Sequence, residues 1–420
     1  MYFLYNIVVH TIILLLSVVA LFNDKIKLFV QGRKGTFGYL TTHLSKDDRL
    51  IWFHTASLGE FEQGLPIIEQ CKLEYPEHKI IVTFFSPSGY EVKKNTQVAD
   101  LVCYLPMDTY SNMKRFLELV QPELVVFVKY EFWPNTLKLL HKKNIPTLLV
   151  SGIFREQQLF FKSYGGFMKK SLKAFTHFFV QNEYSKNLLN KIGFQNVTVS
   201  GDTRFDRVIE ILDRKNELEF MERFVGESNC LVAGSTWAED EIILVDYINK
   251  TIRTDLKVVI APHKIQSEQL EKLKNGIQKK VVFYSNIDLE TLGQAEVLIV
   301  DTIGLLTRIY SYADIAYVGG GMGSTGLHNT LEPAVFGVPV LIGKHYKGFI
   351  EAEKLVELGG IESICNKEEF SEKLNYILDN QEVKTVKGNI NKKYIEKKTG
   401  AKIQIGNYIR KLLKVSLTDR

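Results

Sequence analysis

The sequence lacks several motifs that would assign a reaction directly. Its 420 residues contain no Asp-x-Asp triplet, which often holds a nucleotide-sugar through a divalent metal, no Walker phosphate-binding sequence and no His-Glu-x-x-His. The four cysteines, Cys71, Cys103, Cys230 and Cys365, lie far apart, without zinc or redox spacing. We therefore expect reduced thiols in a cytosolic protein, no metal site and no cofactor. A phosphate-binding site without a metal ion would have to offset the phosphate charge with helix N-termini and basic residues.

The chain also lacks a large excess of charge of one sign. The chain has 53 lysines and arginines against 48 acidic residues, a formal net charge of +5. This excess is too small and too scattered to predict binding to nucleic acid, although it suits an anionic substrate or an acidic membrane surface. The hydrophobic fraction of 45% is ordinary for a globular protein. The chain length exceeds the size at which a single core keeps growing, so two domains are expected.

One long apolar run is present, from Tyr2 to Phe22, with four polar interruptions. About 20 such residues can cross a bilayer as a helix. Basic residues follow the run but do not precede it, which by the positive-inside rule places the rest of the chain in the cytoplasm. No small-residue cleavage site stands out, so we expect a retained anchor rather than a cleaved signal. The alternative is a buried or interfacial helix.

Short apolar runs alternate with helical patterns along two stretches of the chain, which is typical of parallel sheets with helices on both faces. The first stretch predicts strands at Leu50–His54, Lys79–Phe85, Leu101–Leu105, Leu124–Val128, Thr147–Val150 and His177–Gln181. After a charged stretch at residues 206–227, the second predicts strands at Cys230–Ala233, Lys257–Ala261, Val281–Tyr284, Val297–Val300, Ile315–Val318 and Val338–Ile342.

The pattern therefore predicts an α/β protein with two doubly wound, Rossmann-like domains. We expect a membrane anchor at residues 1–23, an N-terminal domain at 24–206, a C-terminal domain at 207–390 and a helical tail at 391–420 that packs back on the N-terminal domain. Two such domains facing each other form a cleft at the carboxyl ends of their strands, where ligands bind. B-type glycosyltransferases and some nucleotide-sugar epimerases share this architecture, and the pattern alone does not separate them.

Acidic residues follow two predicted strands of the first stretch. Glu60 ends the turn Ser57-Leu58-Gly59-Glu60, which opens a helix, and Glu131 lies among aromatic residues after the strand at Leu124–Val128. A carboxylate at either place could act as a general base if burial raised its pKa toward neutrality. The alternative is that the helix dipole favours acids in a first helical turn. Arg204 could bind a phosphate or carboxylate, or pair with Asp206 on a surface loop.

The second stretch is rich in turns suited to phosphate. The segment Tyr317–Gly343 places three glycines after a strand, and Glu332 then begins a short helical segment. Backbone N–H groups and a helix N-terminus there favour an anion. Gly234-Ser235-Thr236, Ile303-Gly304-Leu305 and Pro262-His263-Lys264 also follow strands and could bind phosphate or a nucleobase, or simply cap helices, and His328 could be a ligand or a loop histidine.

In their order along the chain, these motifs resemble those of the 3-deoxy-D-manno-octulosonic acid (Kdo) transferases of lipopolysaccharide synthesis. The matching segments are His54–Glu60, Glu131–Asn135, Gly234–Thr236, Asp301–Gly304, Gly319–Gly320 and His328–Pro333. The resemblance implies a metal-independent enzyme of B-type glycosyltransferase fold at the cytoplasmic (inner) membrane. It also implies transfer of Kdo from CMP-Kdo to a lipid A precursor (lipid IVA), with inversion at the anomeric carbon.

The resemblance further implies roles for individual residues. Glu60 would deprotonate the acceptor hydroxyl, Glu131 and Arg204 would stabilise the transition state, and Glu332 would accept hydrogen bonds from the ribose. The other expected substrate-binding residues are Pro262, His263, Ile303, Gly304, Leu305, Asn329, Thr330, Leu331, Ser57, Gly59, Gly234, Ser235 and Thr236.

The chain departs from the family pattern in the donor motifs. Pro262-His263-Lys264 replaces the usual Pro-Arg-His, Ile303-Gly304-Leu305 replaces Met-Gly-Glu, and Arg204 replaces a lysine. The alternatives are an epimerase of the same fold acting on a soluble nucleotide-sugar and a non-catalytic, membrane-tethered nucleotide-sugar binder.

Overall fold

The computed structural model describes residues 1–418, with side chains to residue 414. The chain divides into two compact units, which we call unit 1 and unit 2. Unit 1 comprises Met1–Arg207 and the C-terminal segment from Thr399, and unit 2 comprises Val208–Lys398. Helix α18 (Gln381–Glu396) runs through the predicted boundary at residue 390 and lies in unit 2. Both units are α/β, as the alternating pattern predicts.

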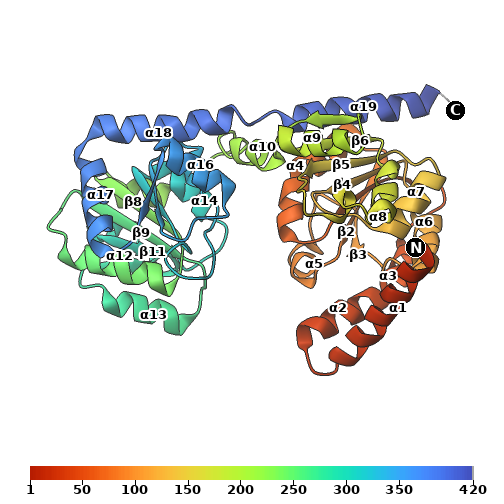
Figure 1. Ribbon diagram of the computed structural model, residues 1–420. Coiled ribbons are helices and arrows are strands. Elements are labelled where there is room, and N and C mark those ends of the chain that lie inside the picture. The colour runs from red at the N-terminus through yellow and green to blue at the C-terminus, as the bar shows by residue number, and fades with distance from the viewer. Residues whose placement is uncertain (419–420) are drawn as a thin grey trace. The chain divides into compact units, whose positions relative to one another are not determined.

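Unit 1 is built on a seven-stranded sheet of order β3-β2-β1-β4-β5-β6-β7, and its strand pairs are parallel (Figure 1). The strands are β1 (Arg49–Thr55), β2 (His78–Phe84), β3 (Leu101–Tyr104), β4 (Leu124–Val128), β5 (Thr147–Gly152), β6 (His177–Val180) and β7 (Val197–Val199). The order reverses between β1 and β4, and ligands bind doubly wound sheets outside the strand ends at such a reversal.

Both faces of this sheet are buried, because alternate residues of a strand point to opposite faces. In β1, Trp52 joins one apolar core and Phe53 joins the other. The helices of unit 1 are α1 (Tyr2–Val19), α2 (Asp24–Lys34), α3 (Thr36–His43), α4 (Leu58–Glu74), α5 (Pro87–Lys93), α6 (Tyr110–Val120), α7 (Pro134–Lys142), α8 (Gly166–Ser171), α9 (Glu183–Lys191), α10 (Thr203–Ile209), which ends just inside unit 2, and α19 (Ala401–Thr418). Helix α19 places Ile405 and Ile409 in the same core as Phe53, so the C-terminal segment stabilises unit 1.

Unit 2 repeats the plan with a second parallel sheet of order β10-β11-β9-β8-β12-β13-β14. The strands are β8 (Asn229–Thr236), β9 (Leu256–Pro262), β10 (Val281–Phe283), β11 (Val297–Ile299), β12 (Ile315–Val318), β13 (Val340–Gly343) and β14 (Ile361–Ile364). The helices are α11 (Glu219–Val225), α12 (Ala238–Lys250), α13 (Ser267–Gly276), α14 (Leu306–Ile309), α15 (Leu331–Ala334), α16 (Ile350–Leu358), α17 (Lys367–Asp379) and α18. Its order reverses between β8 and β12.

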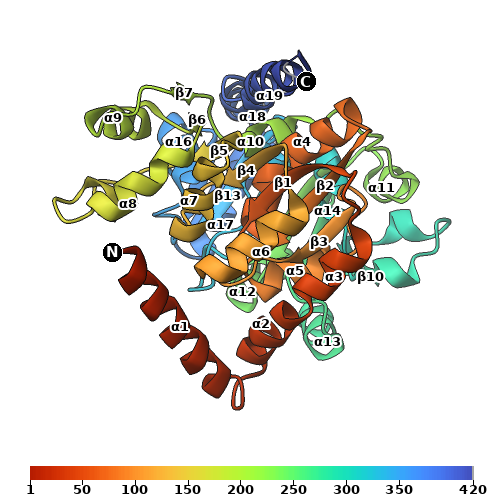
Figure 2. The same ribbon diagram turned by 90° about the vertical axis from the view of Figure 1, so that its right-hand side faces the viewer.

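The N-terminal run folds as predicted into a single helix, α1, which is long and apolar enough to cross a membrane by length and composition alone. Figure 2 shows α1 and α2 as an angled pair of helices joined by a short turn. Helix α4 begins at Leu58, so Gly59 and Glu60 lie in its first turn.

Candidate active site

Glu60 lies directly beyond the end of a central strand of unit 1. Strand β1 ends at Thr55, Ser57 is the N-cap of α4, and Glu60 is in the first helical turn. The Ser57 hydroxyl donates a hydrogen bond to the Glu60 carboxylate, which is half-buried. The positive end of the helix dipole also stabilises a charged carboxylate there. Glu60 is therefore accessible to a substrate, while the hydrogen bond from Ser57 holds its carboxylate in one orientation.

Tyr130 connects Glu60 with another predicted residue. Burial raises the pKa of the Tyr130 hydroxyl, and the charges of Arg155, Glu60, Arg204 and Asp202 also act on that group. These side chains therefore share one electrostatic neighbourhood in unit 1. The charges of Glu60 and Arg204 thus both act on Tyr130, a residue that the sequence analysis did not single out.

Arg204 is held by a buried acid. Its Nε and Nη2 donate hydrogen bonds to Asp202 Oδ2 at 2.9 and 2.8 Å, and its backbone N–H donates to Asp202 Oδ1 at 2.9 Å. Asp202 is only 5% exposed and also accepts from the Gln63 amide at 3.0 Å. The Arg204 side chain is 40% exposed, so Asp202 fixes a guanidinium that solvent or a ligand can still reach. The structure thus shows an ion pair between Arg204 and Asp202, a residue that the sequence analysis did not name as its partner.

Glu131 lies beside the end of β1 because β1 and β4 are neighbours, with His54 opposite Phe127. Lys129, the first residue after β4, has a φ of 72°, which is uncommon for a residue with a side chain. Glu131 Oε2 accepts a hydrogen bond from Trp133 Nε1 at 2.8 Å and lies 3.2 Å from His54 Nε2. The Glu131 side chain is only 13% exposed, so these contacts hold a carboxylate that water scarcely reaches.

His54 is fully buried and its two nitrogens face different groups. Nδ1 lies 2.8 Å from Thr83 Oγ1 and 3.2 Å from the Thr83 carbonyl oxygen, and Trp52 Nε1 donates to the same Thr83 hydroxyl at 2.8 Å. Because a carbonyl oxygen only accepts, we assign a proton to Nδ1. Nε2 lies beside Glu131 and accepts a hydrogen bond from Trp133 Nε1 at 3.1 Å, so one indole N–H serves both groups. The sequence analysis missed Trp52 and Thr83, which read as ordinary strand residues.

Of the predicted donor residues of unit 2, Gly234–Thr236 and Pro262 lie at the carboxyl ends of its strands β8 and β9. Val318 of β12 is opposite Gly234 of β8, and Thr236 is opposite Pro262 of β9. A Cβ added to Gly319 would lie 2.4 Å from the Ser235 carbonyl oxygen, so this close approach requires glycine.

A buried acid that the sequence analysis did not find organises this glycine turn. Asp240 is fully buried, and its Oδ2 accepts from the backbone N–H groups of Gly320 at 2.8 Å and Trp237 at 2.9 Å. Its Oδ1 accepts from the Tyr317 hydroxyl at 2.7 Å. Asp240 therefore joins the start of α12 to the end of β12 and sets the shape of the turn.

Glu332 has partners that orient it. Its Oε1 accepts from Asn329 Nδ2 at 3.1 Å and its Oε2 accepts from Thr307 Oγ1 at 3.3 Å. Burial raises the pKa of the Tyr310 hydroxyl, and the Glu332 charge raises it further. A Cβ on Gly234 would clash with that same hydroxyl, so Tyr310 links the turn after β8 to Glu332. Of the other predicted donor residues, Thr330 and Leu331 are buried, Ile303 is exposed, Gly304 has a φ of 94° and Leu305 precedes α14.

Three aromatic rings gather beside these strand ends. Trp237 Nε1 donates a hydrogen bond to His328 Nε2 at 2.9 Å. The centroid of the His263 ring lies 4.6 Å from that of Trp237, on which it stacks, and 4.4 Å from that of His328. Burial lowers the pKa of His263, as does the charge of Lys264, and burial lowers the pKa of His328. His263 is therefore neutral near pH 7, and Lys264, with its Nζ 4.9 Å over the Trp237 ring, is the cation of this motif.

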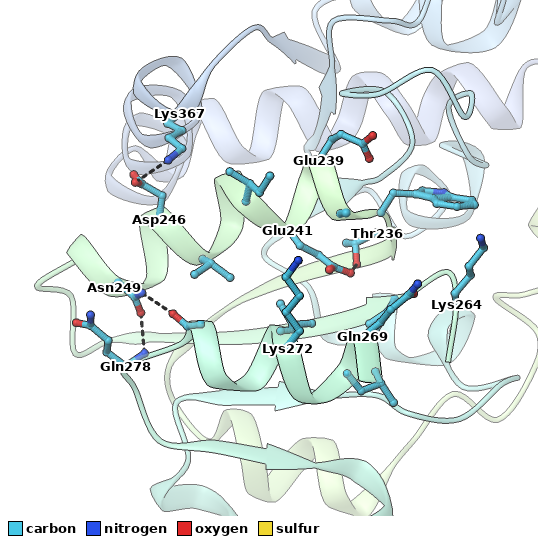
Figure 3. A pocket seen from close by; sticks show the side chains of 18 of the residues that line it. Thr236, Glu239, Glu241, Asp246, Asn249, Lys264, Gln269, Lys272, Gln278 and Lys367 are labelled. Carbon is cyan, nitrogen blue, oxygen red and sulfur yellow. Dashed lines mark hydrogen bonds and ion pairs between the residues drawn. The ribbon is translucent and has the colours of Figure 1, made fainter. Parts of the chain in front are cut away.

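A groove of about 960 Å³ runs between α12 and α13, and Thr236 and Pro262 line one end of it (Figure 3). The Thr236 hydroxyl donates to Glu241 at 3.0 Å, and Lys272 projects from α13 toward this end. Burial raises the pKa of Glu241, partly opposed by the Thr236 hydrogen bond. Residues 303–305 and 329–332 are not among the groove's lining residues. In residues 1–418 no three His, Cys, Asp or Glu side chains group as metal ligands do.

Comparisons with known proteins identify relatives of this chain. A family model described as 3-deoxy-D-manno-octulosonic-acid transferase (kdotransferase) matches residues 31–207. A 3-deoxy-D-manno-octulosonic acid transferase of Aquifex aeolicus is 30% identical over 335 residues, which cover 78% of this chain and 86% of that protein. A bifunctional glycosyltransferase/methyltransferase of Fusobacterium nucleatum is 28% identical over 79% of this chain, which spans 52% of that protein.

The structural comparison shows the fold alone. A UDP-GlcNAc 2-epimerase from Neisseria meningitidis, solved bound to UDP-GlcNAc, aligns with a TM-score of 0.57 at 16% identity, over 87% of this chain and 99% of that one. The two parallel sheets and the relatives together define an enzyme of the B-type glycosyltransferase fold. Within that class, the chain belongs to the 3-deoxy-D-manno-octulosonic acid (Kdo) transferase family. The resemblance drawn from the sequence motifs is thereby confirmed.

Proposed function

We propose that this protein transfers Kdo from CMP-Kdo to a lipid A precursor at the cytoplasmic face of the membrane, with inversion and without a metal ion. Membership of the Kdo transferase family is the observation that carries the proposal. The apolar helix α1, long and apolar enough to cross a membrane, supports a membrane-bound acceptor. The epimerase alternative keeps only the support of a shared fold.

Glu60 is the general base in this proposal. Attack by an acceptor hydroxyl on the ketosidic carbon requires removal of its proton, and a carboxylate in hydrogen-bond reach of the hydroxyl can accept it. Ser57 and the first turn of α4 give Glu60 a defined direction. Ser57 and Gly59 belong to the same acceptor-binding residues of unit 1.

Glu131 and Arg204 act on the charge that develops as the bond to the leaving group breaks. Glu131, held by the Trp133 N–H and packed beside His54, presents its carboxylate to the reacting centre in one orientation. Arg204, held by Asp202, offers a guanidinium that suits the carboxylate of Kdo or a phosphate.

The CMP group binds to unit 2 at the carboxyl ends of β8, β9 and β12. Gly234, Ser235, Thr236 and Gly319 supply close backbone approach, and Lys264 supplies positive charge near Pro262 and His263. Glu332, oriented by Asn329 and Thr307, accepts hydrogen bonds from the ribose hydroxyls. Residues 303–305 and 330–331 complete this donor surface.

Glu60→Gln tests the base assignment, with Glu62→Gln as the matched control. Glu62 lies two residues along the same helix and pairs with Lys93 at 2.8 Å. The Glu60→Gln variant should bind CMP with the affinity of the wild type, as measured by calorimetry. Its rate of Kdo transfer should fall at least about 100-fold, as expected when a general base is removed. Glu62→Gln should keep its transfer rate. Near wild-type transfer by Glu60→Gln would refute the role of Glu60.

A further inference from the structure

Helix α1 cannot remain in water. Large apolar side chains are exposed along it and at its end, among them Phe3 at 80%, Leu14 at 70%, Leu21 at 77% and Phe22 at 86%. An exposed apolar surface of this extent needs an apolar partner. Within α1 only Val9 is buried, so the rest of unit 1 does not provide that partner.

The beginning of α1 is nevertheless bound to the globular part of unit 1. The Tyr5 hydroxyl donates to Asp108 Oδ2 at 2.8 Å. Asn6 Oδ1 accepts from the Tyr110 backbone N–H at 3.0 Å and from Asn135 Nδ2 at 3.1 Å. These contacts join α1 to the starts of α6 and α7, where unpaired backbone N–H groups are satisfied by side chains.

Asp108 shows that this attachment belongs to the folded unit. It is 2% exposed, and its carboxylate also accepts from the backbone N–H groups of Asn135 and Thr136 at 3.0 and 2.9 Å. Aromatic contacts support the same attachment, since the Tyr2 ring lies 4.6 Å from Phe167. A polar cluster at two helix starts does not enter hydrocarbon. The first six residues of the chain therefore stay at the level of the globular unit.

The remaining length is too short to cross a bilayer. From Ile7 to the end of α1 at Val19 there are 13 helical residues. At 1.5 Å per residue they extend about 20 Å, against roughly 30 Å of hydrocarbon.

The chain also turns back. Leu21 and Phe22 form the turn, and the Asn23 side chain caps α2 by accepting from the Ile26 N–H at 3.1 Å. At the other end of α2, Arg33 is buried and donates to the carbonyls of Leu105 at 3.0 Å and Phe85 at 2.5 Å.

Both ends of the α1–α2 pair are thus fastened to unit 1, and the turn between them points away from it (Figure 2). Three exposed lysines, Lys25, Lys27 and Lys34, lie on α2.

We propose that α1 and α2 form a monotopic hairpin, in which α1 lies along the surface of an anionic membrane with its apolar side chains in one leaflet and does not cross it. The lysines of α2 meet the phosphate headgroups, and Met1 stays on the same side as the catalytic units. This differs from the spanning helix with an outward N-terminus that the charge distribution predicts. The inference stands on the contacts of α1 and not on the identity of the acceptor.

Cysteine labelling tests the topology. One cysteine is placed in a short extension before Met1 in a Cys365→Ser background, and a membrane-impermeant maleimide is applied to spheroplasts and to inside-out vesicles. The unmodified protein, whose native Cys365 is exposed on unit 2, is labelled in parallel as the control for the cytoplasmic face. We expect both cysteines to react in inside-out vesicles alone. Labelling of the N-terminal cysteine in intact spheroplasts would overturn the proposal.

Vesicle flotation with purified protein tests the lipid partner. The variant Lys25→Gln/Lys27→Gln/Lys34→Gln should bind vesicles rich in phosphatidylglycerol roughly 100-fold more weakly than the wild type. Both proteins should bind pure phosphatidylcholine vesicles equally, because the apolar face is unchanged. Unchanged binding to anionic vesicles, or an equal loss on both kinds, would contradict the proposed headgroup contact.

Discussion

Replacing Trp133 by phenylalanine tests whether the held orientation of Glu131 matters for transfer. The change removes the indole N–H that reaches Glu131 Oε2 at 2.8 Å and keeps an aromatic ring against Phe85, 4.7 Å away. The Glu131 side chain is 13% exposed, so water replaces the lost donor poorly. A hydrogen bond to a charged group contributes about 1.5–3 kcal/mol, which corresponds to a loss of roughly 10- to 150-fold in rate.

The assay is steady-state transfer with CMP-Kdo and a lipid A precursor, each varied at saturating concentration of the other. Because Glu131 is proposed to act as the bond to the leaving group breaks, kcat should fall and KM for both substrates should change little. Phe85→Leu is the control, since it alters the ring packing and keeps the N–H. A wild-type kcat for Trp133→Phe, or an equal loss for Phe85→Leu, would refute the reasoning.

Three further predictions follow from other contacts. Burial raises the pKa of Glu123, but hydrogen bonds from Arg49 and His78 outweigh it and hold this pKa at about 2, below the usual 4.5. The stabilising effect of the Glu123 carboxylate is therefore complete above pH 4.5 and is lost as the pH falls through 2. Glu123→Gln should therefore lower the free energy of unfolding in urea by about 2 kcal/mol at pH 7 and by much less near pH 2, and an equal loss at both pH values would contradict this. Asp240→Ala should weaken CMP binding, measured by calorimetry, at least about 10-fold, because the Gly320 N–H loses its acceptor. An unchanged affinity for CMP would show that Asp240 does not shape the donor site. Chelation of divalent metal with EDTA should leave transfer unchanged, and recovery on adding Mg²⁺ after a loss would show a metal requirement.

The central strands were predictable because burial on both faces leaves a strong signal. β4 reads Leu-Val-Val-Phe-Val and is buried throughout. Two edge strands escaped prediction. β7 is three residues long, and β14 carries Glu362, which pairs with Lys387 at 2.6 Å. An edge strand has a neighbour on one side and tolerates polar residues, so its pattern is weak.

The candidate site was predictable where residues follow strands, as Glu60 and Glu131 do. Residues that position these groups were not. Thr83 lies inside β2 and Asp240 inside the first turn of α12, where the sequence gives each an ordinary structural explanation. Their partners come from strands or turns distant along the chain, such as His54 for Thr83 and Gly320 for Asp240. Only the fold shows that these polar groups are buried and what they hold.

The central claim is that this member of the Kdo transferase family uses CMP-Kdo and a lipid A precursor. Mass spectrometry of purified lipid IVA after incubation with CMP-Kdo and the full-length protein tests it most directly. The account predicts a product heavier than the acceptor by one or more Kdo residues, with release of CMP, and neither with Glu60→Gln. An acceptor of unchanged mass after incubation with folded wild-type protein and intact CMP-Kdo would contradict the account.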